Sequence, residues 1–176
     1  SKIGKACYIP VGHKSPKCLK KDAVIKKLKK ILEDPSIKKI GQNIKFDFIV
    51  FYKCGITLSS MEDTMLMSYV LDAGKNRHNM DTLSEIHLGH KTISFKEMVG
   101  TGKKEINFSE VELDKAKDYA AEDADVTFRL YKKFIKNLKS EKMINIYEIF
   151  EKPLIKILAF MEIEGVEIDS KFLKSL

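Results

Sequence analysis

A long helix, predicted from about Glu110 to Asn137, constrains the fold more than any other feature of this sequence. Ser109 and Glu112 have the spacing of a capping box, in which two side chains satisfy free backbone N–H groups at a helix start. The chain has 176 residues, 44% of them hydrophobic, which is enough for one sizeable core. We therefore expect the long helix to pack within a single domain, with residues left over for a fragment of another.

Shorter strand-like and helical patterns precede the long helix. Cys7–Val11 is a β-prone run that predicts an edge strand, because Pro10 cannot donate a ladder hydrogen bond. Residues 21–32 predict an amphipathic helix with lysines on its outer face. Residues 37–41 end in glycine and lead directly into an apolar stripe over residues 43–52. This order predicts a strand, a tight turn and a helix.

Two more helices are predicted in the middle of the chain. Asp63 precedes a strongly apolar segment, residues 64–71, which predicts a buried helix capped by that aspartate or a neighbour. Thr82 and Glu85 have capping-box spacing before a short helix that ends near Gly89.

The remaining segments are predicted mainly from their polarity and glycines. Residues 73–79 predict a loop, and the polar stretch 90–104 predicts a mobile surface loop. Residues 147–161 have helical periodicity, and residues 166–169 predict a short extended segment.

Composition limits the classes of protein to consider. The chain has 32 Lys plus Arg against 25 Asp plus Glu, a net charge of +7, which is compatible with a polyanionic partner but also with solvated lysine faces. Cys7, Cys18 and Cys54 lack zinc-binding spacing, so reduced thiols in a cytosolic protein are expected. Because no apolar stretch approaches ~20 residues and no signal peptide is evident, we expect a cytoplasmic protein without membrane contact.

Two polar pairs are candidates for a catalytic site. Asn43 and Asp47 are four residues apart on one predicted helix, and Tyr119 and Asp123 have the same spacing on the long helix. Converging carboxylates suit phosphodiester hydrolysis with two divalent metals, for which hard oxygen ligands favour Mg²⁺ or Mn²⁺. Taken alone, each pair also fits a solvated helix aspartate and a tyrosine ring packed on the core.

The two pairs together carry a family resemblance. Residues 41–47, Gly-Gln-Asn-Ile-Lys-Phe-Asp, resemble the second exonuclease motif of the proofreading domains of bacterial DNA polymerase I, the family A polymerases. Residues 119–125, Tyr-Ala-Ala-Glu-Asp-Ala-Asp, resemble the third motif in its Tyr-x-x-x-Asp form. The resemblance covers essentially the whole chain, since other segments follow the family's order and spacing, namely 8–11, 63–66, 77–81 and 90–95.

The resemblance implies a fold, a reaction and a metal site. The fold would be the α/β ribonuclease H-like 3′–5′ exonuclease fold, a mixed sheet with flanking helices. The activity would be release of nucleotides from the single-stranded 3′ end of DNA, with Mg²⁺ or Mn²⁺ as cofactor. Asp47 and Asp123 would be metal-binding carboxylates, and Tyr119 would orient the attacking water. Asn43 would support the site or contact the substrate.

The resemblance also implies substrate contacts. Phe95 matches an aromatic position against the terminal bases, although it could equally anchor its loop. Arg77 could bind a phosphate, or it could be a solvated surface arginine. Phe46 lies where the family often has tyrosine, so a hydroxyl contact to DNA is expected to be absent.

Domain limits and truncation follow from the same resemblance. Residues 1–146 would form the exonuclease domain, and residues 147–176 would begin the polymerase domain of the same parent chain. The family's first motif, Asp-x-Glu on a leading strand, does not occur, so the domain is expected to be N-terminally truncated with its first strands missing. Two of four metal carboxylates would then be absent, and this chain alone is expected to have little or no nuclease activity.

Two other functions remain open at this point. One is a catalytically inactive module that serves a family A polymerase as structural support or as a DNA-binding surface. The other is a free-standing RNA-degrading exonuclease, against which the polymerase-like residues 150–176 argue. Retention of the motif acids favours the proofreading exonuclease, since clustered acids carry a desolvation cost that a site explains.

Overall fold

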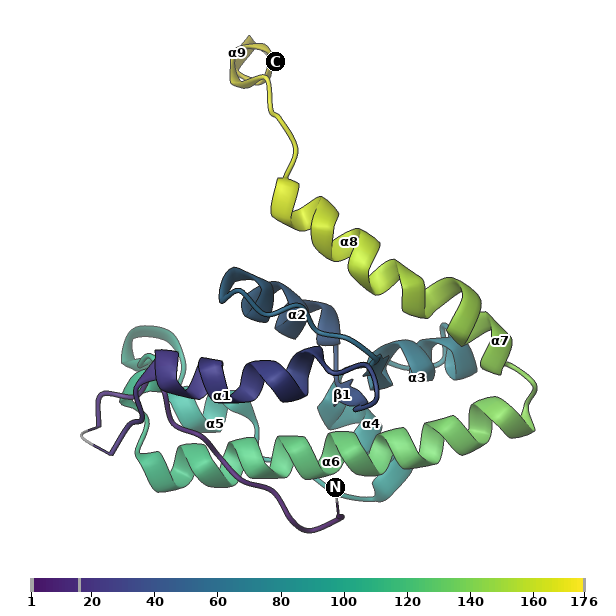
Figure 1. Ribbon diagram of the computed structural model, residues 1–176, viewed down its shortest axis with the longest axis horizontal. Coiled ribbons are helices and arrows are strands. Elements are labelled where there is room, and N and C mark those ends of the chain that lie inside the picture. The colour runs from purple at the N-terminus through teal and green to yellow at the C-terminus, as the bar shows by residue number, and fades with distance from the viewer. Residues whose placement is uncertain (1, 16, 176) are drawn as a thin grey trace.

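The computed structural model describes residues 2–15 and 17–175, with the side chain of residue 103 left undescribed. In Figure 1 the long helix α6 (Leu113–Ser140) runs along one side of the molecule, and α1 (Lys21–Glu33) lies above it, beside the strands. From the far end of α6 the chain returns through α7 (Ile144–Ile146) and α8 (Lys152–Glu164), and the segment after α8 leads away from the body. The fold is therefore built along one long helix.

A short parallel sheet lies at the centre of the described chain. It pairs β1 (Lys39–Gly41) with β2 (Met61–Asp63), in the register that sets Lys39 opposite Met61 and Gly41 opposite Asp63. The connection between them contains α2 (Ile44–Lys53), as a parallel crossover requires. The α/β class is thus confirmed, with helices as the dominant elements. Within the described residues no helix is long and apolar enough to cross a membrane.

The other helices surround this centre. They are α3 (Thr64–Asp72), α4 (Met80–Leu88) and α5 (Phe95–Val99), with 3₁₀ turns η1 (Gly102–Lys104) and η2 (Phe108–Glu110). The last helix, α9 (Ser170–Ser175), lies apart from them at the end of an extended segment (Figure 1). Between α7 and α8 lies a π-helical turn, η3 (Tyr147–Glu151), so that residues 144–164 form one continuous helical segment. Pro153 lies at the second position of α8, directly after the π-helical turn, where it cannot donate a backbone hydrogen bond.

Most predicted elements are confirmed. The helices predicted over residues 21–32, 43–52 and 64–71 correspond to α1, α2 and α3, and the strand predicted over 37–41 contains β1. Asp63 caps α3 by accepting a hydrogen bond from the Met65 N–H at 2.9 Å. The short helix α4 ends at Gly89 in the left-handed conformation, as the glycine predicted.

The predicted strand at Cys7–Val11 is wrong. This segment has no regular structure, and its Pro10 carbonyl accepts a hydrogen bond from the Leu19 N–H. A strand requires a neighbouring strand, and in the described chain β1 and β2 pair with each other. The N-terminal segment is held elsewhere, since the Gly4 N–H donates to the Asp125 carboxylate on α6 at 2.6 Å.

Both predicted capping boxes are wrong. Thr82 lies inside α4, whose N-cap position is Asn79, and Ser109 lies in η2, so that α6 begins at Leu113. The capping boxes that form are Ser94 with Glu97 at the start of α5 and Asn107 with Glu110 at the start of η2. The first lies within residues 90–104, so this segment contains helices and is not only a loop.

Three hydrophobic clusters form the core of the described residues, the smallest of them around Val99, Val111 and Ala116. In the first, α6 packs against α3 through Leu130, Phe134 and Met67, with the buried ring of Tyr147. In the second, α2 packs against α8; its buried members are Ile44, Phe48, Ile56, Leu58, Met61, Ile155 and Ala159. Residues after 146 are therefore packed into the same clusters as residues before it.

Candidate active site

The turn before α2 sets the geometry of the first motif. Asn43 is in the left-handed conformation at φ 57°, a region that asparagine enters more readily than most residues. Gly41 precedes it, and a Cβ on this residue would lie 2.9 Å from the Ile44 side chain. Gln42 donates to the His78 carbonyl at 2.7 Å and accepts from the Thr64 hydroxyl at 2.5 Å. These contacts explain why glycine, an amide and asparagine occur in this order.

Asp47 and Asp123 line one cavity of about 590 Å³. Asp47 comes from the first turn of α2 and Asp123 from the middle of α6, with β1 between these two helices. The rest of the wall is mostly apolar with two lysines; its residues are Leu32, Lys38, Lys39, Ile40, Gly41, Gln42, Ile44, Phe51, Leu58, Met80, Ala124, Thr127 and Phe128. The structure therefore brings together the two carboxylates predicted as metal ligands.

Both carboxyl groups are harder to ionise than usual. Burial raises the pKa of Asp123 to about 6, the neighbouring Glu122 and Asp81 add to the rise, and the Tyr119 hydroxyl opposes it. Burial also raises the pKa of Asp47, with a contribution from Asp63. The Asp47 side chain is accessible to water, but it lines a cavity whose walls displace bulk solvent, and this accounts for its desolvation.

The lysines of the cavity do not neutralise these acids. Lys38 donates to Glu62 at 3.0 Å, and Lys39 donates to the carbonyls of Asp34 and Ile37 in the connection after α1. Among the described residues neither Asp47 nor Asp123 takes part in a salt bridge. The cavity thus holds negative charge without a protein counter-ion.

Asp123 has the features of a ligand for a hard cation. Its Oδ1 atom is buried and finds no hydrogen-bond partner in the described part of the chain. A buried carboxylate oxygen without a partner is costly unless a cation or solvent satisfies it. The donor set is nonetheless small, because no group of three His, Cys, Asp or Glu residues among those described is arranged to hold a metal. Asp47 and Asp123 fit a divalent ion as partial ligands only.

Tyr119 and Phe95 lie in an aromatic cluster beside the first half of α6. The Phe95 ring is stacked with Phe108 at a centroid distance of 5.9 Å, and Tyr119 lies 6.2 Å from Phe95 and 5.9 Å from Phe108. Phe95 is 50% exposed, so one face of the cluster is open to solvent. Burial raises the pKa of Tyr119, with a further contribution from Asp123, and the hydroxyl therefore keeps its proton.

The other predicted residues are outside the cavity wall. Asn43 is exposed at the start of α2, and Phe46, one turn of helix along, is 67% exposed. Arg77 is exposed in the 73–79 loop and makes no salt bridge to a described residue. All three are available to a ligand from solvent, but the structure does not join them to the two aspartates.

Sequence reasoning missed the residues that hold the aromatic cluster and the first motif in place. Glu122 accepts from the Ile93 N–H at 2.7 Å and pairs with His90 Nε2 at 2.8 Å, which ties the segment before α5 to α6. Asp63 was predicted only as a helix cap, yet it also accepts from the N–H groups of Asn43 and Ile44. Only the adjacency of Glu122 to the Tyr-x-x-x-Asp motif could have pointed to it.

Comparison with known families agrees with this arrangement of motifs. The model of the 3′–5′ exonuclease family of family A DNA polymerases matches residues 2–139. This chain belongs to that family. The family predicted from residues 41–47 and 119–125 is thereby confirmed.

Among similar proteins is the DNA polymerase I of Rhizobium leguminosarum, 41% identical over 184 residues, which cover 98% of this chain and 18% of that protein. The DNA polymerase I of Pseudomonas aeruginosa is 40% identical over 98% of this chain and 20% of its own length. This chain therefore spans about a fifth of the length of the curated relatives it matches.

Solved structures confirm the fold. A chain described as the apo form of the nuclease superposes with a TM-score of 0.64 at 19% identity, over 81% of this chain and 68% of its own. NrnC of Brucella melitensis, in a structure bound to pGG, gives 0.62 at 22% identity over 80% and 67% of the two chains. The fold is that of the ribonuclease H-like 3′–5′ exonucleases.

Proposed function

We propose that this chain is the proofreading domain of a DNA polymerase I and removes nucleotides from the single-stranded 3′ end of DNA. One observation carries the proposal: the carboxylates of the second and third motifs line the same cavity without a counter-ion. Family membership supports the reaction, and the relatives named DNA polymerase I support DNA as the substrate. Bacterial DNA as substrate implies a cytoplasmic location.

Each motif residue has a role in this reaction. Asp47 and Asp123 would hold Mg²⁺ or Mn²⁺, which when bound lowers the pKa of water and stabilises charge on the phosphate. The Tyr119 hydroxyl, which keeps its proton, would donate to or orient the attacking water beside Asp123. The buried Oδ1 of Asp123 supports this assignment because it needs a partner.

Three residues would contact the substrate. Phe95, half exposed beside Phe108, offers a face on which a terminal base can stack. Arg77 is free of described carboxylate partners and would bind a phosphate, while Asn43 and the exposed Phe46 ring would line the approach to the site. Residues 1–146 would be the exonuclease domain, and residues 147–176 would begin the polymerase domain of the parent chain.

The small number of metal-binding side chains in the cavity favours a second function. Two carboxylates in the cavity are fewer than a pair of divalent ions requires, and no group of three His, Cys, Asp or Glu residues among those described is arranged to hold a metal. Residues 1–176 alone could therefore serve as an inactive structural or DNA-binding module. We expect this chain by itself to have little nuclease activity.

One experiment separates the two functions. A 5′-labelled single-stranded oligonucleotide is incubated with Mg²⁺ or Mn²⁺ and either residues 1–176 or the full-length protein. A descending ladder with the full-length protein, lost in Asp47→Ala and Asp123→Ala, would support proofreading. If the full-length protein also produced no ladder, the inactive module would be the better description.

A further inference from the structure

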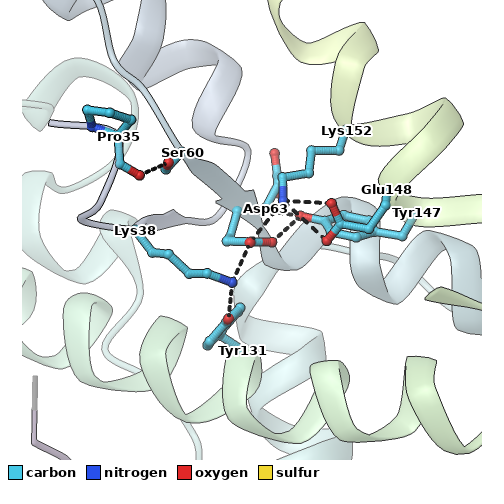
Figure 2. Close-up of polar contacts among 9 residues, drawn as sticks. Pro35, Lys38, Ser60, Asp63, Tyr131, Tyr147, Glu148 and Lys152 are labelled. Atoms are coloured by element: carbon cyan, nitrogen blue, oxygen red, sulfur yellow. Dashed lines mark hydrogen bonds and ion pairs between the residues drawn. The ribbon is translucent and has the colours of Figure 1, made fainter. Parts of the chain in front are cut away.

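A buried carboxylate behind the cavity joins three parts of the fold. Glu62, the middle residue of β2, is 1% exposed, and its Oε1 accepts from Lys38 at 3.0 Å and from Lys152 at 2.9 Å. Its Oε2 accepts from the Tyr147 hydroxyl at 3.1 Å. In Figure 2 the side chains of Lys38, Lys152 and Tyr147 converge beside Asp63. Lys38 lies just before β1, Lys152 is the first residue of α8, and Tyr147 is the first residue of the π-helical turn. Glu62 therefore ties the sheet to residues 144–164.

Tyr147 extends this network to the next residue of β2. Its hydroxyl accepts a hydrogen bond from the Asp63 N–H at 2.9 Å while it donates to Glu62. The side chain is fully buried, and burial raises the pKa of Tyr147, so the hydroxyl keeps the proton that it donates. Both hydrogen bonds of this single hydroxyl hold the end of β2.

The Asp63 side chain then holds the first turn of α2. Its Oδ1 accepts from the Asn43 N–H at 3.0 Å, and its Oδ2 accepts from the Ile44 N–H at 2.9 Å. These N–H groups lie at the start of α2, where a helix has no internal acceptors for them. Asn43 is in the left-handed conformation and has no side-chain cap bond of its own, so α2 depends on Asp63 for its starting geometry.

We propose that Tyr147 and Asp63 are positioning residues for Asp47. Tyr147 orients Asp63, Asp63 orients the first turn of α2, and Asp47 lies in that turn facing the cavity. Because Lys152 on α8 also binds Glu62, a shift of the 144–164 segment is transmitted to the same turn. The effect on catalysis rests on the proposed function, but the mechanical link does not.

The test compares two tyrosines attached to the same network. Tyr147→Phe removes the hydroxyl that contacts Asp63, whereas Tyr131→Phe removes a hydroxyl that only accepts from Lys38 at 3.3 Å. Hydrogen exchange of the Asn43 and Ile44 amides is measured in the full-length protein, with the Leu130 amide of α6 as reference. We expect Tyr147→Phe to speed exchange at Asn43 and Ile44 by about fivefold relative to Leu130. Tyr131→Phe should leave that ratio unchanged.

A second variant covers the case in which Tyr147→Phe does not fold. Asp63→Asn keeps the side-chain volume but replaces one acceptor oxygen with a donor that cannot bind the Ile44 N–H. It should speed exchange at Ile44 relative to Leu130 in the same way. Uniform acceleration at all three amides, or none, in both variants would show that the network serves global stability only and would overturn the inference.

Exonuclease kinetics provide the functional arm. Tyr147→Phe should lower kcat and raise the Mg²⁺ concentration for half-maximal rate, each by about fivefold, while KM for the oligonucleotide stays within about twofold. Tyr131→Phe should match the unsubstituted protein. If exchange responds but kcat and the Mg²⁺ dependence do not, positioning for catalysis is refuted. If the unsubstituted protein has no activity, the proposed function fails while the exchange result still decides the mechanical link.

Discussion

The two carboxylates of the cavity are held in different ways. Asp123 lies in the middle of the 28-residue helix α6, and the buried Val126 and Leu130 on the same helix anchor it to the core. Asp47 lies in the first turn of the 10-residue helix α2, directly after the left-handed Asn43. Asp123 is therefore held in place by its own helix. Asp47 depends on a turn that is held in place by contacts with other parts of the fold.

This difference predicts where the site is vulnerable. A long packed helix keeps its register without help from any single side chain, so the position of Asp123 should tolerate most distant substitutions. The position of Asp47 depends on hydrogen bonds that cross from α2 to Asp63. Substitutions that never touch Asp47 should therefore change its geometry.

The largest expected effect tests whether Asp47 on α2 and Asp123 on α6 are equally necessary for catalysis. Asp123→Ala and Asp47→Ala in the full-length protein should each lower kcat by roughly 10³-fold or more, because residues that act as one catalytic unit fail together. The double variant should be no worse than either single variant. Additive losses in a 5′-labelled oligonucleotide assay would show that the two acids act independently and would break the comparison.

The next effect concerns the aromatic cluster on the α6 side. Phe95→Ala should raise KM for single-stranded DNA by about tenfold, since base stacking contributes ~1–3 kcal/mol. The rate at saturating substrate should change little, because Phe95 lies away from the cavity wall. An unchanged KM would assign Phe95 to anchoring α5 against Phe108 instead.

On the α2 side, Gly41→Ala should destabilise the protein by about 1–3 kcal/mol, because the new Cβ would lie 2.9 Å from Ile44. Gly12→Ala is the matched control, since no atom lies within 4 Å of a Cβ at that position. Urea unfolding measures both. Equal free energies of unfolding for the two variants would mean that the turn before α2 relaxes freely.

The smallest effect is a pH dependence on the α6 side. The pKa of Asp123 is raised from 3.8 to about 6, so its ionisation opposes folding and the cost grows as the pH rises through this interval. In the absence of divalent metal, Asp123→Asn should raise the free energy of unfolding by about 1–2 kcal/mol at pH 8 and have little effect below pH 4. Denaturant curves at the two pH values would measure this. A variant that is equally stabilised at both would contradict a charge effect.

Sequence patterns predicted well those features that depend on near neighbours. The periodicity of residues 21–32 indicated α1 and the strongly apolar run 64–71 indicated α3, and the acid before that run correctly indicated the Asp63 cap. The predictions fail where the structure of a segment depends on a neighbouring segment distant in the sequence. Cys7–Val11 has strand composition, but among the described residues no strand lies beside it, and β2 is three residues long, too short to show a period. The same capping-box pattern was misplaced at Thr82 because helix interiors can contain it too.

The site also has features that local sequence patterns predicted and features that they could not predict. The i to i+4 spacing and the family motifs indicated Asp47 and Asp123, which the structure places in one cavity. The bonds from Asp63 to Asn43 and Ile44 join residues about twenty positions apart, and only the β1–β2 register, with Gly41 opposite Asp63, brings them together. No local pattern carries that register, because both strands have only three residues.

The π-helical turn at Tyr147–Glu151 sets the rotational phase of α8. An α-helix turns by about 100° per residue, so deleting one residue from this turn would rotate Ile155 and Ala159 away from α2 while Tyr147 stayed in place. Inserting a residue would have the opposite effect. Insertions and deletions within these five residues should therefore be selected against.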